Sequence, residues 1–189
     1  QITELYFKLI LQEIRQIQSE WAEAGDIKKL NMRLRRIINY VRNLTTSFDV
    51  MSEGMEKDQF LKFRMALLPA SGFQSAQIRQ IELMSTHLYN LTDATQRESL
   101  APDSSFEHLY QFLYWKSGNR ELSSGKKTLT LRVFEQKYDK SLLELAKNQE
   151  FMNLSVIASQ TQDIPACKEL FREYDLMTNV FWALSHYKT

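Results

Sequence analysis

The sequence predicts a single all-α domain, a helical bundle without a β-sheet. Glycine and proline, which end helices and form turns, number only five and three among 189 residues. Apolar residues recur at three- and four-residue steps along most of the chain, as they do on one face of an amphipathic helix. A chain of 22.3 kDa is also long enough to bury a substantial core. We therefore expect one helical domain over residues 1–189.

The composition excludes several classes of protein. The 24 Lys and Arg residues balance 23 Asp and Glu residues, so the strong positive charge of a nucleic-acid-binding protein is missing. No apolar run approaches the roughly 20 residues that a membrane span needs. The single cysteine, Cys167, cannot form an internal disulfide bond, and no signal-peptide pattern opens the sequence. These features favour a cytoplasmic protein that binds neither nucleic acid nor membranes.

The amino-terminal part of the sequence predicts two antiparallel helices. An apolar pattern runs from Ile2 to Trp21, and Gly25-Asp26 ends it. A second pattern follows from Leu30 to Phe48, and the short connection makes the pair a helical hairpin. We interpret the basic cluster of the second helix as a solvated face rather than a binding patch; it consists of Lys28, Lys29, Arg33, Arg35 and Arg36.

The rest of the chain predicts further helices separated by polar loops. Only residues 128–134 show an alternation that would also suit a β-strand, and we favour helix or irregular structure there. Ser105 is suited to cap a helix, and Pro165 to begin the last one. The expected helices cover residues 55–68, 74–91, 106–118, 142–157 and 165 to the end, with loops at 92–105 and 119–127.

One passage of the sequence carries information about function. Residues 63–79 read FRMALLPASGFQSAQIR. This passage closely resembles the F-R-x-x-L-x-P-x-S-G-F-Q-S-x-Q-x-R signature of the tryptophan 2,3-dioxygenase family. QITELYFK at residues 1–8 is similar to the Q-x-x-E-L-W-x-K helix of the family, and Trp182 with His186 to its W-x-x-x-H segment. The resemblance spans almost the whole chain and is weakest between about residues 90 and 165.

The resemblance implies an enzyme. Members of the family are all-α haem proteins, typically homotetramers, that insert both atoms of O₂ across the indole C2–C3 bond of L-tryptophan to give N-formylkynurenine. The expected cofactor is therefore haem b with its iron, and the expected partners are L-tryptophan, O₂ and further copies of the chain.

The resemblance also implies a haem site. His186 corresponds to the proximal ligand of the haem iron, and Trp182 lies one turn earlier on the same helix face, where it can support the haem. Without the resemblance, a lone histidine on a helix would be interpreted as structural. Phe48 and Leu67 are candidates for lining the pocket, although apolar residues at helical spacing are more often plain core. His87 and His108 match no motif position and are expected to be ordinary, partly exposed residues.

A substrate site follows from the same resemblance. Arg64 corresponds to the arginine that binds the substrate carboxylate, because a guanidinium group offers two parallel donors. Phe60 lies one turn before Arg64, where the family has an aromatic residue near the substrate. Ser71 and Gly72 occupy the turn that approaches haem and substrate, where glycine lets the backbone come close to a ligand.

The sequence departs from the family pattern in three places. The distal histidine of the family would stand immediately before Gln1, and its glycine-rich loop would follow the proximal histidine beyond Thr189, so no catalytic residue is assigned and both ends are expected to be truncated. Tyr6 replaces the usual tryptophan. Two alternatives stay open: a haem-dependent oxygenase that modifies a substituted tryptophan or indole in secondary metabolism, and a helical homologue without catalytic activity.

Overall fold

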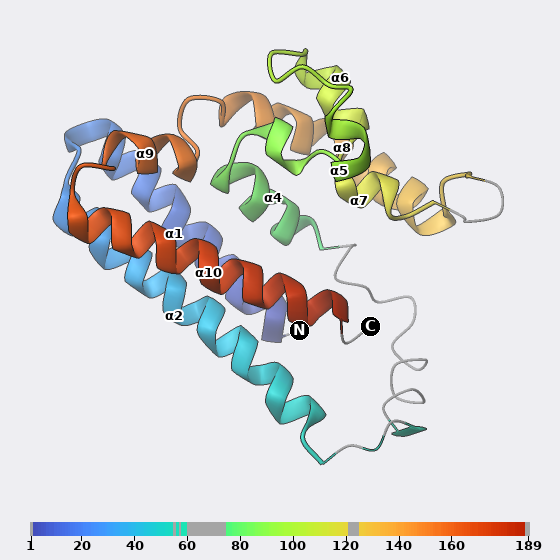
Figure 1. Cartoon of the computed structure of the whole chain (residues 1–189), viewed down its shortest axis with the longest axis horizontal. Helices are drawn as coiled ribbons and strands as arrows, with labels where there is room; N and C mark the ends of the chain where they lie inside the picture. The colour runs from blue at the N-terminus through green and yellow to red at the C-terminus, as the bar shows by residue number, and fades with distance from the viewer. Residues whose placement is uncertain (1, 55, 57, 60–74, 121–124, 188–189) are drawn as a thin grey trace. The chain divides into compact units, whose positions relative to one another are not determined.

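The structure is a computed structural model that describes residues 2–54, 56, 58–59, 75–120 and 125–187. These residues form helices and two isolated β-bridges, Thr92 with Leu113 and Arg120 with Lys127, and no strand. The all-α prediction is confirmed. The chain divides into two compact units (Figure 1). Unit 1 is Gln1–Gly72 with Ala158–Thr189, and unit 2 is Phe73–Ile157. The single domain expected over residues 1–189 stays a prediction.

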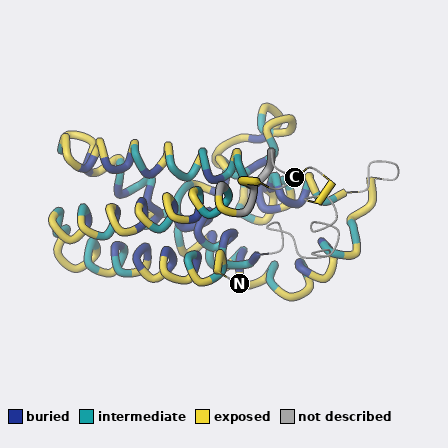
Figure 2. Tube along the Cα trace, turned by 90° about the horizontal axis from the view of Figure 1, so that it is seen from below, coloured by how far each residue is buried: buried dark blue, intermediate teal, exposed yellow. Residues whose placement is uncertain are grey.

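Unit 1 consists mainly of three long helices, α1 (Ile2–Ala24), α2 (Ile27–Ser52) and α10 (Pro165–Tyr187). Both α1 and α10 pack along α2. Each long helix has a buried side and an exposed side (Figure 2), as the apolar periodicity predicts. The core of unit 1 is mostly aliphatic and includes Ile10, Leu11, Ile14, Ile17, Leu30, Leu34, Ile37, Ile38, Val41, Leu44, Leu170 and Phe171.

The turn between α1 and α2 is the predicted Gly25-Asp26 pair. Gly25 has a φ of 58°, a left-handed conformation that residues with a Cβ rarely adopt. The Asp26 carboxylate then accepts hydrogen bonds from the backbone N–H groups of Lys28 (2.9 Å) and Lys29 (3.1 Å), which caps the start of α2. Local chemistry thus reverses the chain and confirms the predicted hairpin.

Unit 2 consists of shorter helices around a core of its own. These are α4 (Ala76–Ser85), the 3₁₀ turn η2 (Leu88–Leu91), α5 (Ala94–Arg97), α6 (Phe106–Gln111), α7 (Tyr114–Ser117) and α8 (Leu129–Asn148), and α9 (Leu154–Gln160) follows at the boundary between the units. Helix α8 packs against α4 and α6. The core that they share contains Leu83, Leu88, Leu100, Leu109, Tyr110, Leu113, Trp115, Phe134, Leu142 and Ala146.

Side-chain caps begin two helices of unit 2, and the first of them confirms the predicted role of Ser105. The hydroxyl of Ser105 accepts from the backbone N–H of His108 (3.2 Å) at the start of α6. The hydroxyl of Thr128 accepts from the N–H of Leu131 (3.2 Å) in the same way and begins α8. Residues 128–134, where the sequence would also suit a strand, therefore cap and begin helix α8.

Several predicted boundaries in unit 2 are wrong because the chain turns inside an apolar pattern. The helix expected over residues 74–91 ends at Ser85, since Thr86 has extended backbone angles (φ −149°, ψ 170°). The helix expected to reach Gly118 is broken at Phe112-Leu113. The loop expected over residues 92–105 contains α5, which the Asp93 carboxylate caps.

The pattern over residues 142–157 is also not one helix. Helix α8 ends at Asn148, and α9 begins only at Leu154. Phe151, which the sequence places on the apolar stripe, lies in the intervening turn with 75% of its surface exposed. Of the helix expected over residues 55–68, only Glu56, Asp58 and Gln59 lie inside the described residues.

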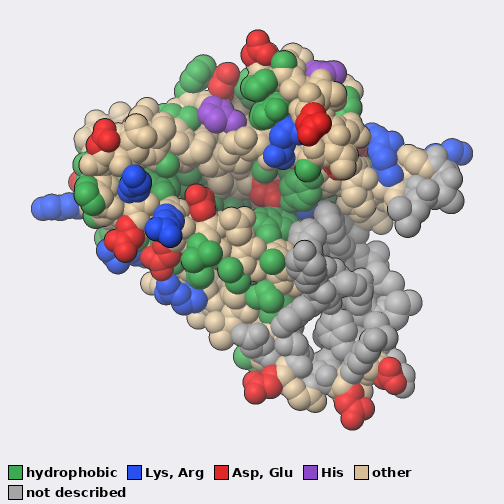
Figure 3. Space-filling model, viewed as in Figure 1, with side chains coloured by type: hydrophobic (Ala, Val, Ile, Leu, Met, Phe, Trp, Pro, Cys, Tyr) green, Lys and Arg blue, Asp and Glu red, His purple; other side chains and the backbone are tan. Residues whose placement is uncertain are grey.

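The surface carries charges of both signs. On the face shown in Figure 3, Lys and Arg side chains lie beside Asp and Glu side chains. His87 and His108 are exposed, as expected. None of the helices in the described parts of the chain combines the length and apolar character needed to cross a membrane.

A fully buried arginine anchors α4 inside unit 2. Arg79 is 0% exposed, and its Nη1 donates to the Glu82 carboxylate one turn later (2.7 Å). The Tyr114 hydroxyl contacts both Arg79 and Glu82, and the Arg79 guanidinium lies 4.7 Å from the Trp115 ring centroid. Burial, followed by the Glu82 charge, raises the pKa of Tyr114 well above its usual range, so this hydroxyl stays protonated.

Loss of the Glu82 carboxylate should destabilise the protein strongly, because it leaves the Arg79 charge buried. We expect Glu82→Leu to lower the free energy of unfolding by about 3–5 kcal/mol, measured by urea denaturation. The double variant Arg79→Met/Glu82→Leu should recover most of the loss, since it removes both charges. A double variant as unstable as Glu82→Leu alone would contradict this account.

A second ion-pair cluster joins α7 to α8. The Lys116 ammonium group lies 2.7 Å from the Asp139 carboxylate and 3.2 Å from that of Glu135, and Lys127 lies 2.7 Å from Glu135. Burial acts to raise the pKa of Glu135, but hydrogen bonds and charges from Lys127 and Lys116 outweigh it, and the pKa is lowered.

This lowered pKa predicts acid sensitivity. A carboxylate whose pKa is lower in the folded state stabilises the fold at pH values above its ordinary pKa of 4.5 and loses that effect as the pH falls below it. We expect stability to fall below pH 4.5 in the parent and to fall less steeply in Glu135→Gln. Thermal melts between pH 3 and 7 measure both slopes, and equal slopes would refute the assignment.

Candidate functional site

Three helix ends meet at one end of unit 1. Phe7, near the start of α1, lies edge-on to Phe181 of α10, with the ring centroids 5.9 Å apart. Phe48, near the end of α2, packs on the same Phe181 ring at 5.8 Å. The α10 helix therefore runs parallel to α2 and antiparallel to α1. Phe181 is buried and joins all three helices.

Two of the predicted haem-pocket residues lie at this end. Phe48 and Trp182 are half-buried, and Trp182 lies beside Phe181 with ring centroids 6.3 Å apart. His186 belongs to the last turn of α10, one turn after Trp182. The structure thus brings Phe48, Trp182 and the backbone of His186 to the same end of three packed helices. We call this the aromatic end of unit 1.

The other predicted site residues lie outside the described residues. They are the substrate-binding candidates Phe60, Arg64, Ser71 and Gly72 and the pocket candidate Leu67. Their roles stay predictions.

The long helices leave apolar side chains exposed near the aromatic end. In α1, Ile2 is 71% exposed, Leu5 60% and Leu9 42%, although the periodicity places all three on the apolar stripe of the helix. Val50, two residues after Phe48 on α2, is 77% exposed. On α1, exposed apolar residues one turn apart are typical of a surface that another group covers.

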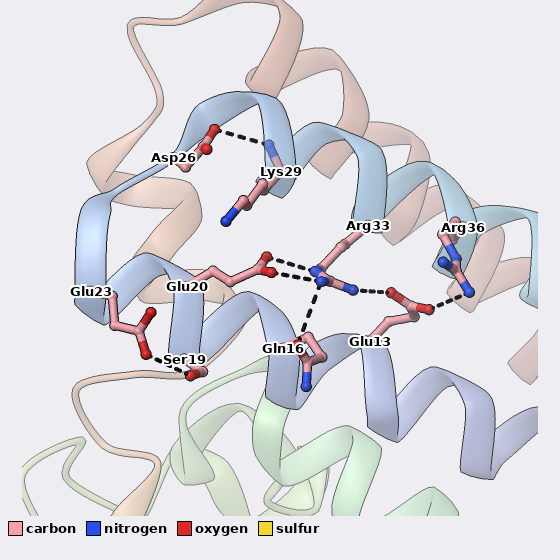
Figure 4. A network of polar contacts seen from close by, with 9 residues as sticks. All are labelled: Glu13, Gln16, Ser19, Glu20, Glu23, Asp26, Lys29, Arg33 and Arg36. Carbon is pink, nitrogen blue, oxygen red and sulfur yellow. Dashed lines mark hydrogen bonds and ion pairs between the residues drawn. The ribbon is translucent and has the colours of Figure 1, made fainter.

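A network of ion pairs braces the hairpin between the aromatic end and the Gly25-Asp26 turn (Figure 4). The buried Glu13 carboxylate of α1 accepts from Arg33 (2.9 Å) and Arg36 (2.8 Å) of α2. Glu20 accepts two further hydrogen bonds from Arg33, at 2.6 and 2.7 Å. The hydrogen bond to Glu20, followed by the one to Glu13, holds the pKa of Arg33 above its usual range despite partial burial.

This network corrects the interpretation of the basic cluster. Lys28, Lys29, Arg35 and Arg36 are exposed, as expected for a solvated face. Arg33 is instead largely covered and bonded to acids of α1. The sequence offers a signal for this, since Glu13 falls among the apolar positions of α1. The Arg36 guanidinium also donates to the Tyr40 hydroxyl (3.1 Å), and the Tyr40 ring lies 6.2 Å from that of Tyr6.

Sequence reasoning missed two residues of the aromatic end and one buried anchor. Phe7 stands inside the QITELYFK passage and Phe181 directly before Trp182, so both follow from neighbouring motif positions. Arg79, the last residue of the 63–79 passage, has a structural partner in Glu82. Burial of this arginine has no signal in a single sequence.

The geometry defines a class of protein: an all-α protein with aromatic and apolar side chains gathered at the ends of long helices, next to a histidine on the final turn. In the described part of the chain, no group of three or more His, Cys, Asp or Glu side chains is placed to hold a metal ion.

Sequence comparison then gives the family. The sequence model of the tryptophan 2,3-dioxygenase family matches residues 1–185, so the chain belongs to this family.

Individual relatives match over a shorter stretch. The chain is 44% identical over 88 residues to tryptophan 2,3-dioxygenase 2 of Ralstonia nicotianae, which covers 44% of this chain and 24% of that protein. Tryptophan 2,3-dioxygenases of Herpetosiphon aurantiacus and Sorangium cellulosum are each 40% identical, over 84 and 88 residues, again 44% of this chain. These matches span 32% and 21% of the two relatives. The chain therefore spans about a fifth to a third of the relatives it matches.

The central position of Phe181 predicts a large effect of truncation. Phe181→Ala removes the ring that joins α1, α2 and α10, and we expect it to lower the free energy of unfolding by about 3–5 kcal/mol. Phe151→Ala is the matched control, and its exposed ring should change stability by no more than about 0.5 kcal/mol. Urea denaturation followed by circular dichroism compares them, and similar losses would show that Phe181 has no special role.

Proposed function

We propose that the protein is a haem-dependent dioxygenase that cleaves the indole C2–C3 bond of L-tryptophan with O₂ to give N-formylkynurenine. The observation that carries this proposal is the family match over residues 1–185, together with His186 on the last turn of α10 next to Phe48 and Trp182. The complete enzyme is proposed to be a homotetramer, as is typical of the family.

The chemistry of the aromatic end suits a haem group. A haem is a flat, largely apolar macrocycle whose iron takes an imidazole nitrogen as axial ligand. Phe48 and Trp182 offer aromatic surface, and the exposed Ile2, Leu5 and Leu9 add aliphatic surface at the start of α1. His186 would hold the iron, and Trp182 would support the haem or the orientation of His186. Leu67 is proposed to line the same pocket.

The proposed substrate site lies in the 60–72 segment of the sequence. Arg64 would bind the tryptophan carboxylate through two parallel N–H donors and so fix the orientation of the substrate as well as its charge. Phe60 would pack against the indole. Ser71 would offer a hydroxyl as donor or acceptor, and Gly72 would let the backbone approach the substrate.

These assignments divide the work between cofactor and protein. When bound, haem supplies the chemistry of O₂. The protein residues bind the amino-acid end of tryptophan, direct the indole C2–C3 edge towards the reacting oxygen and exclude water. Positioning of this kind lowers the barrier to the reaction.

The division of roles predicts separable losses in the full-length protein. His186→Ala should abolish the haem absorption band, because the axial ligand is lost. Arg64→Ala should keep haem but weaken tryptophan binding about 10- to 100-fold, the effect of losing a charged hydrogen-bonding partner. Absorption spectra and tryptophan titration measure the two losses, and a formylkynurenine assay measures the activity.

The exposed Arg132 of α8 provides a matched control for Arg64, since Arg132→Ala removes the same charge far along the sequence from the motif. It should change neither haem nor tryptophan binding. Loss of haem with unchanged tryptophan affinity in Arg64→Ala would contradict the assignment, and haem binding retained by His186→Ala would overturn the proposed function.

A further inference from the structure

Three polar contacts join the α1–α2 hairpin to the end of α9 and to α10. The Trp21 indole N–H of α1 donates to the Gln160 side-chain oxygen at the end of α9 (2.8 Å). The Cys167 thiol donates to the Asn31 side-chain oxygen of α2 (3.2 Å). Further along, the Arg42 guanidinium of α2 donates to the Glu173 carboxylate (2.7 Å). All six residues belong to unit 1.

Apolar packing alone does not fix the position of α10 along α2. The buried residues of α10 recur at three- and four-residue steps from Cys167 to Tyr174, and so do those of α2 from Leu30 to Leu44. When both faces repeat at this spacing, a shift of one helix by one turn again places apolar side chains on apolar side chains. Polar groups within such an interface specify one register at some cost in stability, as they do in coiled coils.

The Asn31–Cys167 contact has this property. Cys167 is 0% exposed and is the smallest side chain on the buried face of α10. A one-turn shift in either direction takes Cys167 away from Asn31 and Glu173 away from Arg42. In one direction the bulky apolar Leu170 or Phe171 would replace Cys167 opposite the Asn31 amide, which would lose its partner.

The register of α10 determines where its last turn lies. A shift of one turn moves every residue of the helix by about 5.4 Å. His186 is on that last turn. A metal–ligand bond tolerates a displacement of only a few tenths of an ångström, so a haem ligand on this turn requires one fixed register.

We propose that Trp21–Gln160, Asn31–Cys167 and Arg42–Glu173 together hold α10 at one axial register on the hairpin and are thereby positioning contacts for His186. The inference rests on the proposed role of His186 as the haem ligand. Each contact is weak by itself, because Trp21–Gln160 and Arg42–Glu173 are exposed and Asn31–Cys167 has a thiol as donor. All three contacts oppose the same movement, a slide of α10 along the hairpin.

The test removes hydrogen bonding at the three contacts while keeping the side chains large enough to fill their places. The variant is Trp21→Phe/Arg42→Met/Cys167→Ala in the full-length protein. The matched control is Arg42→Lys/Cys167→Ser with Trp21 retained, which keeps a donor at each position. Both proteins also carry Lys29→Cys and Asn179→Cys at exposed positions of α2 and α10, labelled with nitroxides. Electron paramagnetic resonance then measures the distance between the two labels, which changes when α10 moves along α2.

The control should give a single distance and bind haem as the parent does. In the triple variant we expect a second distance, displaced by about 5 Å, and haem affinity at least about tenfold lower, because His186 is displaced in part of the population. A triple variant with only the distance of the control would overturn the inference. A displaced distance with unchanged haem affinity would overturn the positioning role.

A separate measurement distinguishes failure of this inference from failure of the proposed function. If His186→Ala retains haem, the proposed function fails and the link from register to haem fails with it. The spin-label distances still decide, without any haem, whether the three contacts set the register of α10.

Discussion

The packing of α10 along α2 is the constraint on which the candidate site depends. Because the two helices run parallel, their carboxyl ends meet at the amino-terminal end of α1, and Phe181 contacts Phe7 and Phe48 there. Residues from the start, the first quarter and the end of the sequence are thereby neighbours. This arrangement places Trp182 and the backbone of His186 at the same helix ends as Phe48.

Buried charges recur in both units, and in each case an oppositely charged neighbour accounts for them. Glu13 lies between Arg33 and Arg36, Arg79 lies against Glu82, and Lys116 lies between Asp139 and Glu135. Buried ion pairs contribute little net stability, since desolvation offsets most of their attraction. They do penalise any arrangement that separates the partners, so they favour one packing of helices whose apolar faces would accept several.

The sequence alone predicts the long helices and the hairpin turn, because an apolar period of many turns and a Gly-Asp turn leave few alternatives. It fails where the chain turns within an apolar run, as at Thr86 and around Phe151, since nearby side chains rather than local propensity decide those breaks. For the site, motif resemblance points to His186 and Trp182, and Phe48 is a candidate only as an apolar residue at helical spacing. It does not reveal Phe181 as the central ring, or Arg79 as a buried anchor, because burial depends on residues far along the chain.

The order in which the helices are made during synthesis gives the hairpin a particular vulnerability. Helices α1 and α2 are joined by Gly25-Asp26 and can pair as soon as both leave the ribosome, whereas the hairpin residues that form polar contacts with α9 and α10 precede their partners by 131 to 139 positions. Until the last helix emerges, the side of the hairpin that it covers is open to water and to other nascent chains. Chaperone dependence and aggregation during expression should therefore centre on this face, and a protein shortened before Pro165 would expose it permanently.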